Sequence, residues 1–307
     1  MKKMMIAIAM VMMAMGANAQ TEFKAAYNAG DKATYEITSK TTVATPAGPA
    51  ELNIKHTNQY EVKAATAEGF EIESTVTKAD IEGVEDMKND VKFAVYGMIV
   101  NQPIVFTTNA AGQPKSIKNW DEVSKKIYEA NAAAIEKVLA AHPEAAQAMP
   151  KEQLIAASNA QVTEEFVLAA INPDIFDLNG KTLKSGDEVL DDSEGVKIKK
   201  TYTITPILGT NVVVEKSTVS MTEEETKAFI IGKLKESGAP EEQIKMIEAN
   251  WQQMVAMGMA KVDGNATKTI RVAKNGWVQS VESTETQSTL GTEIQATSSV
   301  KLTDKNF

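Results

Sequence analysis

Alternation of apolar and polar residues is the clearest pattern along the chain. Between residues 52 and 64 one parity reads Leu, Ile, His, Asn, Tyr, Val, Ala, and the other reads Asn, Lys, Thr, Gln, Glu, Lys. A period of two puts these sets on opposite faces, so the segment is predicted to be a long, half-buried strand. Related patterns, together with Val, Ile and Thr enrichment, predict strands at 32–43, 91–100, 103–108, 195–208, 211–220, 266–273, 277–289 and 292–303.

Apolar residues spaced three to four apart predict helices in two regions. The first region contains helices at 121–140, 150–159 and 163–171, the last with Thr163 as N-cap. The second is a helical hairpin, in which Thr222 caps one helix and a second helix follows the turn at 238–240. Asn275-Gly276 predicts a two-residue hairpin between the late strands.

The order strands, helices, strands, helices, strands favours an α+β fold. We expect a twisted antiparallel sheet or half-barrel with two helical insertions packed against it. One domain over 20–307 is the simplest organisation. A weak echo between segments 107–117 and 271–281 leaves open two related halves, about 20–185 and 186–307.

The first nineteen residues have the pattern of a secretory signal peptide. Lys2 and Lys3 precede an apolar run over 4–15, which ends at Ala17-Asn18-Ala19. The run is shorter than the roughly 20 residues that a spanning helix needs, and no integral membrane segment is expected after it. Gln20 rather than Cys at the cleavage position predicts no lipid anchor. We therefore expect a soluble periplasmic or extracellular protein.

Composition narrows the possible chemistry. The chain has no cysteine, which excludes disulfides, thiolate metal sites and a cysteine nucleophile. Without Lys2 and Lys3, 30 basic side chains face 41 acidic ones, a net charge of −11 that disfavours nucleic acid as a partner.

The two histidines do not form a metal site. His56 lies on the apolar parity of its strand and is predicted to be a hydrogen-bonded core residue. His142 precedes Pro143 at a helix end, where a cation suits the helix dipole. Their separation gives no ligand spacing, so no metal or other cofactor is expected.

Signatures of catalysis are weak. The sequence contains neither Gly-x-Ser-x-Gly nor a glycine-rich phosphate loop. Acidic runs at 187–188, 191–192 and 223–225 fall at turns and at a helix start, where solvation and the helix dipole account for them. We expect a protein that is not an enzyme, and a carboxylate-dependent hydrolase ranks last among the alternatives.

Several short elements together carry a resemblance. They are Gly30-Asp31-Lys32-Ala33-Thr34-Tyr35, a glycine hairpin leading into Ile117-Lys118-Asn119-Trp120, Gly186-Asp187-Glu188-Val189, and a closing meander with glycine turns. The set resembles uncharacterised exported β-rich proteins common in Bacteroidota. In architecture alone, the expected fold is similar to the half-barrel carriers of outer-membrane lipoproteins. Neither resemblance supplies catalytic residues.

Two functional hypotheses lead. The first is a non-catalytic envelope or secreted protein that binds an apolar ligand or a client chain between sheet and helices. Its candidate ligand-binding residues are Ile247, Trp251, Met254 and Val255, on one stripe of a methionine-rich helix. Ordinary core packing is the alternative for this stripe. The second hypothesis is a secreted structural or interaction module that uses Thr- and Ser-rich strand faces such as 283–288.

Overall fold

The computed structural model describes residues 20–45, 48–88, 90–141, 150–172, 174–192, 195–236, 239–257, 260–289 and 291–307. The predicted signal peptide, residues 1–19, and His142 lie outside these described ranges. Within them, no helix is long and apolar enough to cross a membrane.

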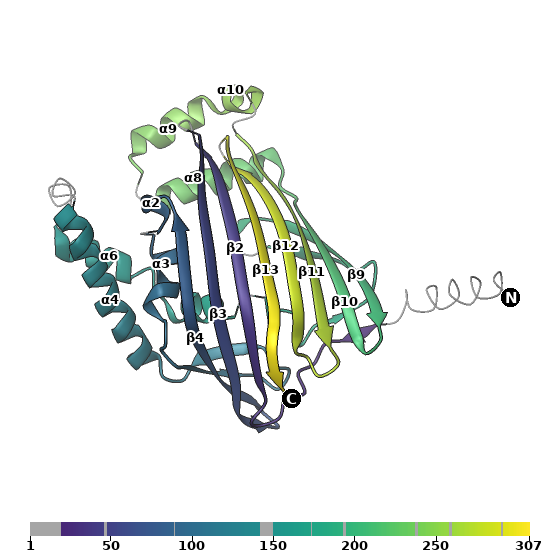
Figure 1. Cartoon of the computed structure of the whole chain (residues 1–307). Helices are drawn as coiled ribbons and strands as arrows, with labels where there is room; N and C mark the ends of the chain where they lie inside the picture. Colours follow the sequence, from purple (N-terminus) through teal and green to yellow (C-terminus); the bar gives the residue numbers. More distant parts are fainter. Residues whose placement is uncertain are drawn as a thin grey trace, which may run out of the picture.

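One large antiparallel sheet organises the described chain (Figure 1). In spatial order its strands are β6 (Pro114–Ile117), β5 (Ile104–Thr108), β4 (Gly69–Gly83), β3 (Gly48–Thr66), β2 (Lys32–Thr45), β13 (Thr292–Asn306), β12 (Val278–Thr289), β11 (Val262–Ala273), β10 (Thr210–Val219), β9 (Ile198–Ile207) and β8 (Glu188–Asp191). Two short strands, β1 (Thr21–Glu22) and β7 (Thr182–Leu183), pair separately.

The first and last strands of this sheet in chain order are neighbours at its middle. The last strand, β13, pairs with β2, so that Val300 lies opposite Ile37. Both outermost strands, β6 and β8, have only four residues. Short edge strands limit the backbone groups that are open to pairing with another chain.

The helices enter in three groups. The bounds are α2 (Glu85–Lys88) and α3 (Val91–Met98); α4 (Trp120–Ala141), α6 (Lys151–Asn159) and α7 (Glu164–Ile171); and α8 (Glu223–Glu236), α9 (Glu241–Ala249) and α10 (Trp251–Ala256). In Figure 1, α3, α4 and α6 stand beside β4, whereas α8, α9 and α10 gather at one end of the sheet. The mixed α+β prediction, with helices packed on an antiparallel sheet, is confirmed.

The main core lies on one face of the sheet, which we call the inner face. Ile37, Val213, Ile270 and Val281 define this face, and each is at most 4% exposed. An aromatic group anchors it, formed by Tyr27, Tyr35, Tyr60, Phe106, Phe176 and Trp277. The opposite face carries cross-strand ion pairs such as Lys55–Glu36, which keep it solvated.

A second, smaller core lies beneath the helical hairpin. Ile230 and Trp251 are 3% and 2% exposed and pack with Ala260 and Val262. This cluster fastens α8 and α10 to the end of β11. Thr222 caps α8 as predicted, since its hydroxyl accepts a hydrogen bond from the Glu225 N–H at 3.3 Å.

One predicted strand is wrong. Residues 91–98 form helix α3, not a strand, which adds a third helical group to the two that were expected. The segment is apolar at most positions, so alternation could not settle its period. Val91, Val95 and Ile99 are buried at a spacing of four because the helix packs on β4. The remaining predicted strands and helices are present with small shifts of their ends.

Two local predictions also need correction. The hairpin at Asn275-Gly276 closes with the Ala273 N–H bonded to the Trp277 carbonyl, so the loop has three residues and Gly276 has φ +88°. The predicted second helix of the hairpin is divided at Asn250 into α9 and α10. Asn competes with the helix through its own side-chain hydrogen bonds, and here its amide donates to the Met246 carbonyl.

Candidate functional site

A groove of about 370 Å³ lies across β9 to β12. It occupies the stretch of the inner face between the main core and the smaller core beneath α8 and α10. Its size falls within the range of about 300–1,000 Å³ typical of small-molecule sites. It is lined by Val196, Ile198, Lys200, Glu215, Ser217, Thr218, Val219, Gly264, Asn265, Ala266, Lys268, Glu285 and Gln287.

Small side chains form the floor of the groove. Ser217 on β10 pairs with Ala266 on β11, which in turn pairs with Glu285 on β12. Gly264 lies two residues along β11, and a Cβ atom there would be 3.2 Å from the Val219 side chain. Longer side chains on the flanking strands make the walls. The hollow therefore follows from residue size along strands whose register is fixed by the sheet.

The groove differs in polarity between its two ends. Ile198 and Val219, which are paired on β9 and β10, make the end nearer the helical hairpin apolar. Glu215 and Lys268, paired on β10 and β11, make the other end charged. An elongated ligand in this groove would meet a hydrocarbon surface at one end and charged groups at the other.

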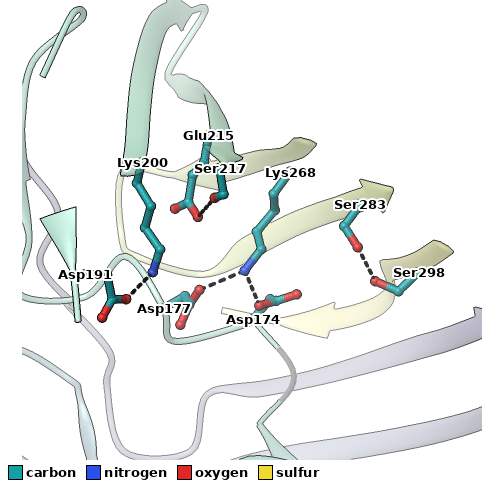
Figure 2. A network of polar contacts seen from close by, with 9 residues as sticks. All are labelled: Asp174, Asp177, Asp191, Lys200, Glu215, Ser217, Lys268, Ser283 and Ser298. Atoms are coloured by element: carbon teal, nitrogen blue, oxygen red, sulfur yellow. Dashed lines mark hydrogen bonds and ion pairs between the residues drawn. The ribbon is translucent and has the colours of Figure 1, made fainter. Parts of the chain in front are cut away.

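Ion pairs and hydrogen bonds hold the charged end (Figure 2). The Lys268 ammonium lies 2.5 Å from Asp174 Oδ1 and 3.0 Å from Asp177 Oδ2, so it joins the sheet to the loop after α7. Lys200 Nζ lies 2.5 Å from Asp191 Oδ2 on the edge strand. The Lys268 pairs connect β11 to a segment more than 90 residues earlier in the chain, whereas the Lys200 pair connects β9 to the neighbouring strand β8.

Two hydroxyl contacts complete this network in Figure 2. The Ser217 hydroxyl donates to Glu215 Oε1 at 3.2 Å, and Glu215 is only 6% exposed. The hydroxyl groups of Ser283 and Ser298 lie 2.7 Å apart on β12 and β13. The polar band thus continues across the inner face from β9 to β13.

The network has a defined charge state at neutral pH. Burial acts to lower the pKa of Lys268, but the carboxylates of Asp177 and Asp174 outweigh it and raise the pKa. Burial acts to raise the pKa of Asp177, and Lys268 outweighs it and lowers the pKa. Burial and the adjacent Glu215 carboxylate raise the pKa of the Tyr202 hydroxyl. Lys268 and Asp177 are therefore charged and Tyr202 is neutral.

The carboxylates at this site do not match the acid–base pattern of a glycosidase. Asp174 and Asp177 converge on one ammonium group, and the pKa of Asp177 is lowered, whereas a general acid needs a raised pKa. In the part of the chain that the structure describes, no three His, Cys, Asp or Glu side chains are grouped to hold a metal ion.

The predicted ligand-binding residues lie elsewhere. Ile247, Trp251, Met254 and Val255 come together in the smaller core, where they pack under α8 rather than along the groove. Trp251 is 2% exposed, and its indole Nε1–H donates to Glu223 Oε1 at 3.2 Å. Their role in binding stays a prediction. The groove residues were not predicted, although small residues two apart at 264 and 266, on an otherwise β-prone strand, are a usable signal.

A separate, more apolar hollow of about 290 Å³ lies among α3, α4 and α6. Its walls include Met98, Ile135, Val138, Leu139 and Leu154. Its polar side chains are Asn131 and Ser158, and the Asn131 amide already donates to Ser158 Oγ and Asn159 Oδ1 at 2.9 and 2.8 Å. This hollow could hold a hydrocarbon group but offers no charged side chain to a polar one.

The prediction that His56 is buried is confirmed, but the hydrogen bond predicted for its ring is not found among the described residues. It is 3% exposed, and within the described residues neither ring nitrogen has a hydrogen-bond partner. Its ring stacks on Tyr96 of α3, with 4.6 Å between ring centroids. Burial lowers the pKa of His56 to about 4, so the ring is neutral at physiological pH.

Comparisons with known proteins give no family. No family model matches the sequence, and no curated protein matches it. Among solved structures, a lipovitellin structure concerned with lipid–protein interactions is similar at a TM-score of 0.44 and 10% identity, over 93% of this chain and 26% of that chain. The chain thus spans about a quarter of the lipovitellin chain.

Two bacterial structures are less similar. A protein of Bacteroides fragilis with a YmcC-like fold has a TM-score of 0.25 and 10% identity, over 94% of this chain and 100% of that chain. A domain from Vibrio parahaemolyticus assigned to outer-membrane lipoprotein sorting has a TM-score of 0.17 and 6% identity, over 90% and 85%. Scores this low reflect remote similarity in strand and helix arrangement, and carry no argument about function.

Proposed function

We propose that this chain is a non-catalytic, exported ligand-binding protein, and that the groove across β9 to β12 binds an amphiphile. The observation that supports this most is the polarity gradient of the groove, from Ile198 and Val219 to Glu215 and Lys268. An acyl or alkyl chain would cover the apolar end and the small floor residues. Its polar head would lie at the charged end.

Chemical complementarity favours binding over catalysis at this site. Both lysines of the groove are held in ion pairs, as Lys268 is with Asp174 and Asp177, and such pairs orient a polar head rather than transfer protons. The apolar end supplies the non-directional part of the affinity, about 25 cal/mol for each Å² of ligand surface removed from water. Export rests on the predicted signal peptide.

Binding can be measured with fluorescent fatty acids and fluorescent alkylamines of the same chain length, titrated into the purified protein. Ala266→Phe fills the floor of the groove. It is expected to weaken binding by about tenfold or more, since the phenyl ring occupies space that the ligand would need. Thr267→Phe is the matched control. Thr267 is the next residue on β11 and is exposed on the opposite face, so its affinity should match the wild type.

A third variant separates the groove from the helical hollow. Ile135→Trp would fill the hollow among α3, α4 and α6 without touching β9 to β12. If Ile135→Trp abolishes binding and Ala266→Phe does not, the ligand occupies the helical hollow and the groove assignment is wrong. If no probe binds the wild-type protein, the amphiphile proposal itself fails.

A further inference from the structure

The turn between β9 and β10 presents an apolar tip. Leu208 is 103% exposed, and the adjacent Ile207 is 46% exposed. These two residues project at the end of a hairpin whose strands pair up to Ile207 and Thr210. Single exposed apolar residues are common on protein surfaces, so exposure alone does not indicate a role.

The backbone of this turn adds a second observation. Leu208 has φ +40° and Gly209 has φ +86°, so both central residues of the two-residue turn are left-handed. Turns of this kind strongly favour Asn-Gly, Asp-Gly or Gly-Gly, because a branched side chain is strained at positive φ. Leucine is therefore an unfavourable residue for the turn, and it is placed where its side chain contacts only solvent.

Basic side chains border the tip. Lys184 is exposed and precedes Ser185, whose hydroxyl is bonded to the Ile204 backbone of β9. Lys274 is exposed in the neighbouring turn, since Ala273 on β11 pairs with Thr210 on β10.

A third lysine comes from the segment after β1, which contacts the turn between β11 and β12 that carries Lys274. Lys24 in this segment is exposed, and the nearby Ala26 N–H donates a hydrogen bond to the Asn275 carbonyl of that turn. The acidic side chains on these elements are Glu22 and Asp187, and Asp187 accepts a hydrogen bond from the Lys184 N–H. Lysines thus outnumber acids here, in a chain with net charge −9.

We propose that this apolar tip, Ile207-Leu208 with Lys24, Lys184 and Lys274 around it, docks on an anionic membrane surface. A projecting apolar tip bordered by lysines fits between lipid headgroups, with the ammonium groups at the level of the phosphates. The contact would be weak and reversible, and its affinity would fall as the salt concentration rises. It would place one end of the sheet at the bilayer (Figure 1).

Sedimentation with vesicles tests this. Wild-type protein should co-sediment with vesicles of phosphatidylglycerol and phosphatidylethanolamine, and much less with vesicles of phosphatidylcholine alone. Leu208→Asn should weaken the first interaction by about tenfold, the loss expected for one buried leucine. Because Asn-Gly suits this turn, the same variant should unfold at a temperature no lower than the wild type.

Leu190→Asn is the matched control. Leu190 is 61% exposed on the edge strand β8, away from the tip, so this variant should bind vesicles as the wild type does. Lys184→Glu with Lys274→Glu should abolish the preference for anionic vesicles. The proposal is overturned if the wild type fails to bind anionic vesicles, or if Leu208→Asn binds them as well as the wild type. Groove binding, measured with soluble probes, is independent of either result.

Discussion

Replacing His56 with phenylalanine tests the account of the inner face most directly. His56 lies on β3 between Ile37 on β2 and Ala79 on β4, and its ring stacks on Tyr96. Phenylalanine keeps a flat ring of similar size in this place. It removes two buried nitrogen atoms that lack hydrogen-bond partners within the described residues, and it removes a group that titrates.

The expected size of the effect follows from the pKa of His56. Burial lowers this pKa from 6.5 to about 4, so the unfolded chain takes up a proton between these pH values that the folded chain does not. Stability is therefore present above pH 6.5 and is lost as the pH falls towards 4. At about 1.4 kcal/mol for each pKa unit, the full loss is about 3 kcal/mol, of which about 2 kcal/mol is gone by pH 5.

Urea unfolding followed by circular dichroism, at pH 8 and at pH 5, provides the measurement. The wild type should lose about 2 kcal/mol more than His56→Phe between the two pH values, because all other titrating groups are shared. At pH 8 His56→Phe should be at least as stable as the wild type, since position 56 then no longer buries an unpaired polar group. His56→Gln is the control: it should remove the pH dependence but keep a buried polar group, and so be less stable than His56→Phe. An equal change for wild type and His56→Phe would refute the argument.

Three further predictions concern stability and can be checked by the same unfolding assay. Lys268→Met should cost about 1–2 kcal/mol, because it leaves the half-buried Asp174 and the more exposed Asp177 without their cation, and replacing both aspartates with asparagine in that background should recover much of the loss. Thr163→Ala removes the N-cap of α7 and should cost about 1 kcal/mol, whereas Thr163→Ser should cost little. Gly69→Ala should destabilise strongly, because Gly69 has φ +146° and a Cβ atom would lie 2.2 Å from the Thr108 carbonyl oxygen; unchanged stability would contradict the backbone geometry of this turn.

Much of the fold follows from local patterns in the sequence. Alternation identified the strands because one face of each strand is solvated by ion pairs and the other is buried. Thr163 and Thr222 were recognisable as helix caps because a capping hydroxyl acts within three residues. The pattern of residues 91–98 does not distinguish a strand from a helix, because a short, mostly apolar segment fits a period of two and a period of 3.6 equally well. Only packing on β4 selects the helix.

Outside residues 91–98, the sequence by itself therefore determined which segments form strands, which form helices, and which side of each is apolar, since these depend on neighbours a few residues away. The tertiary structure decided what those apolar and charged sides meet. It packed Trp251 and Met254 into a small core, and it joined Lys268 to Asp174 and Asp177 across more than ninety residues of chain. Strand register and the order of strands in the sheet bring such groups together, and neither can be deduced from a local sequence pattern.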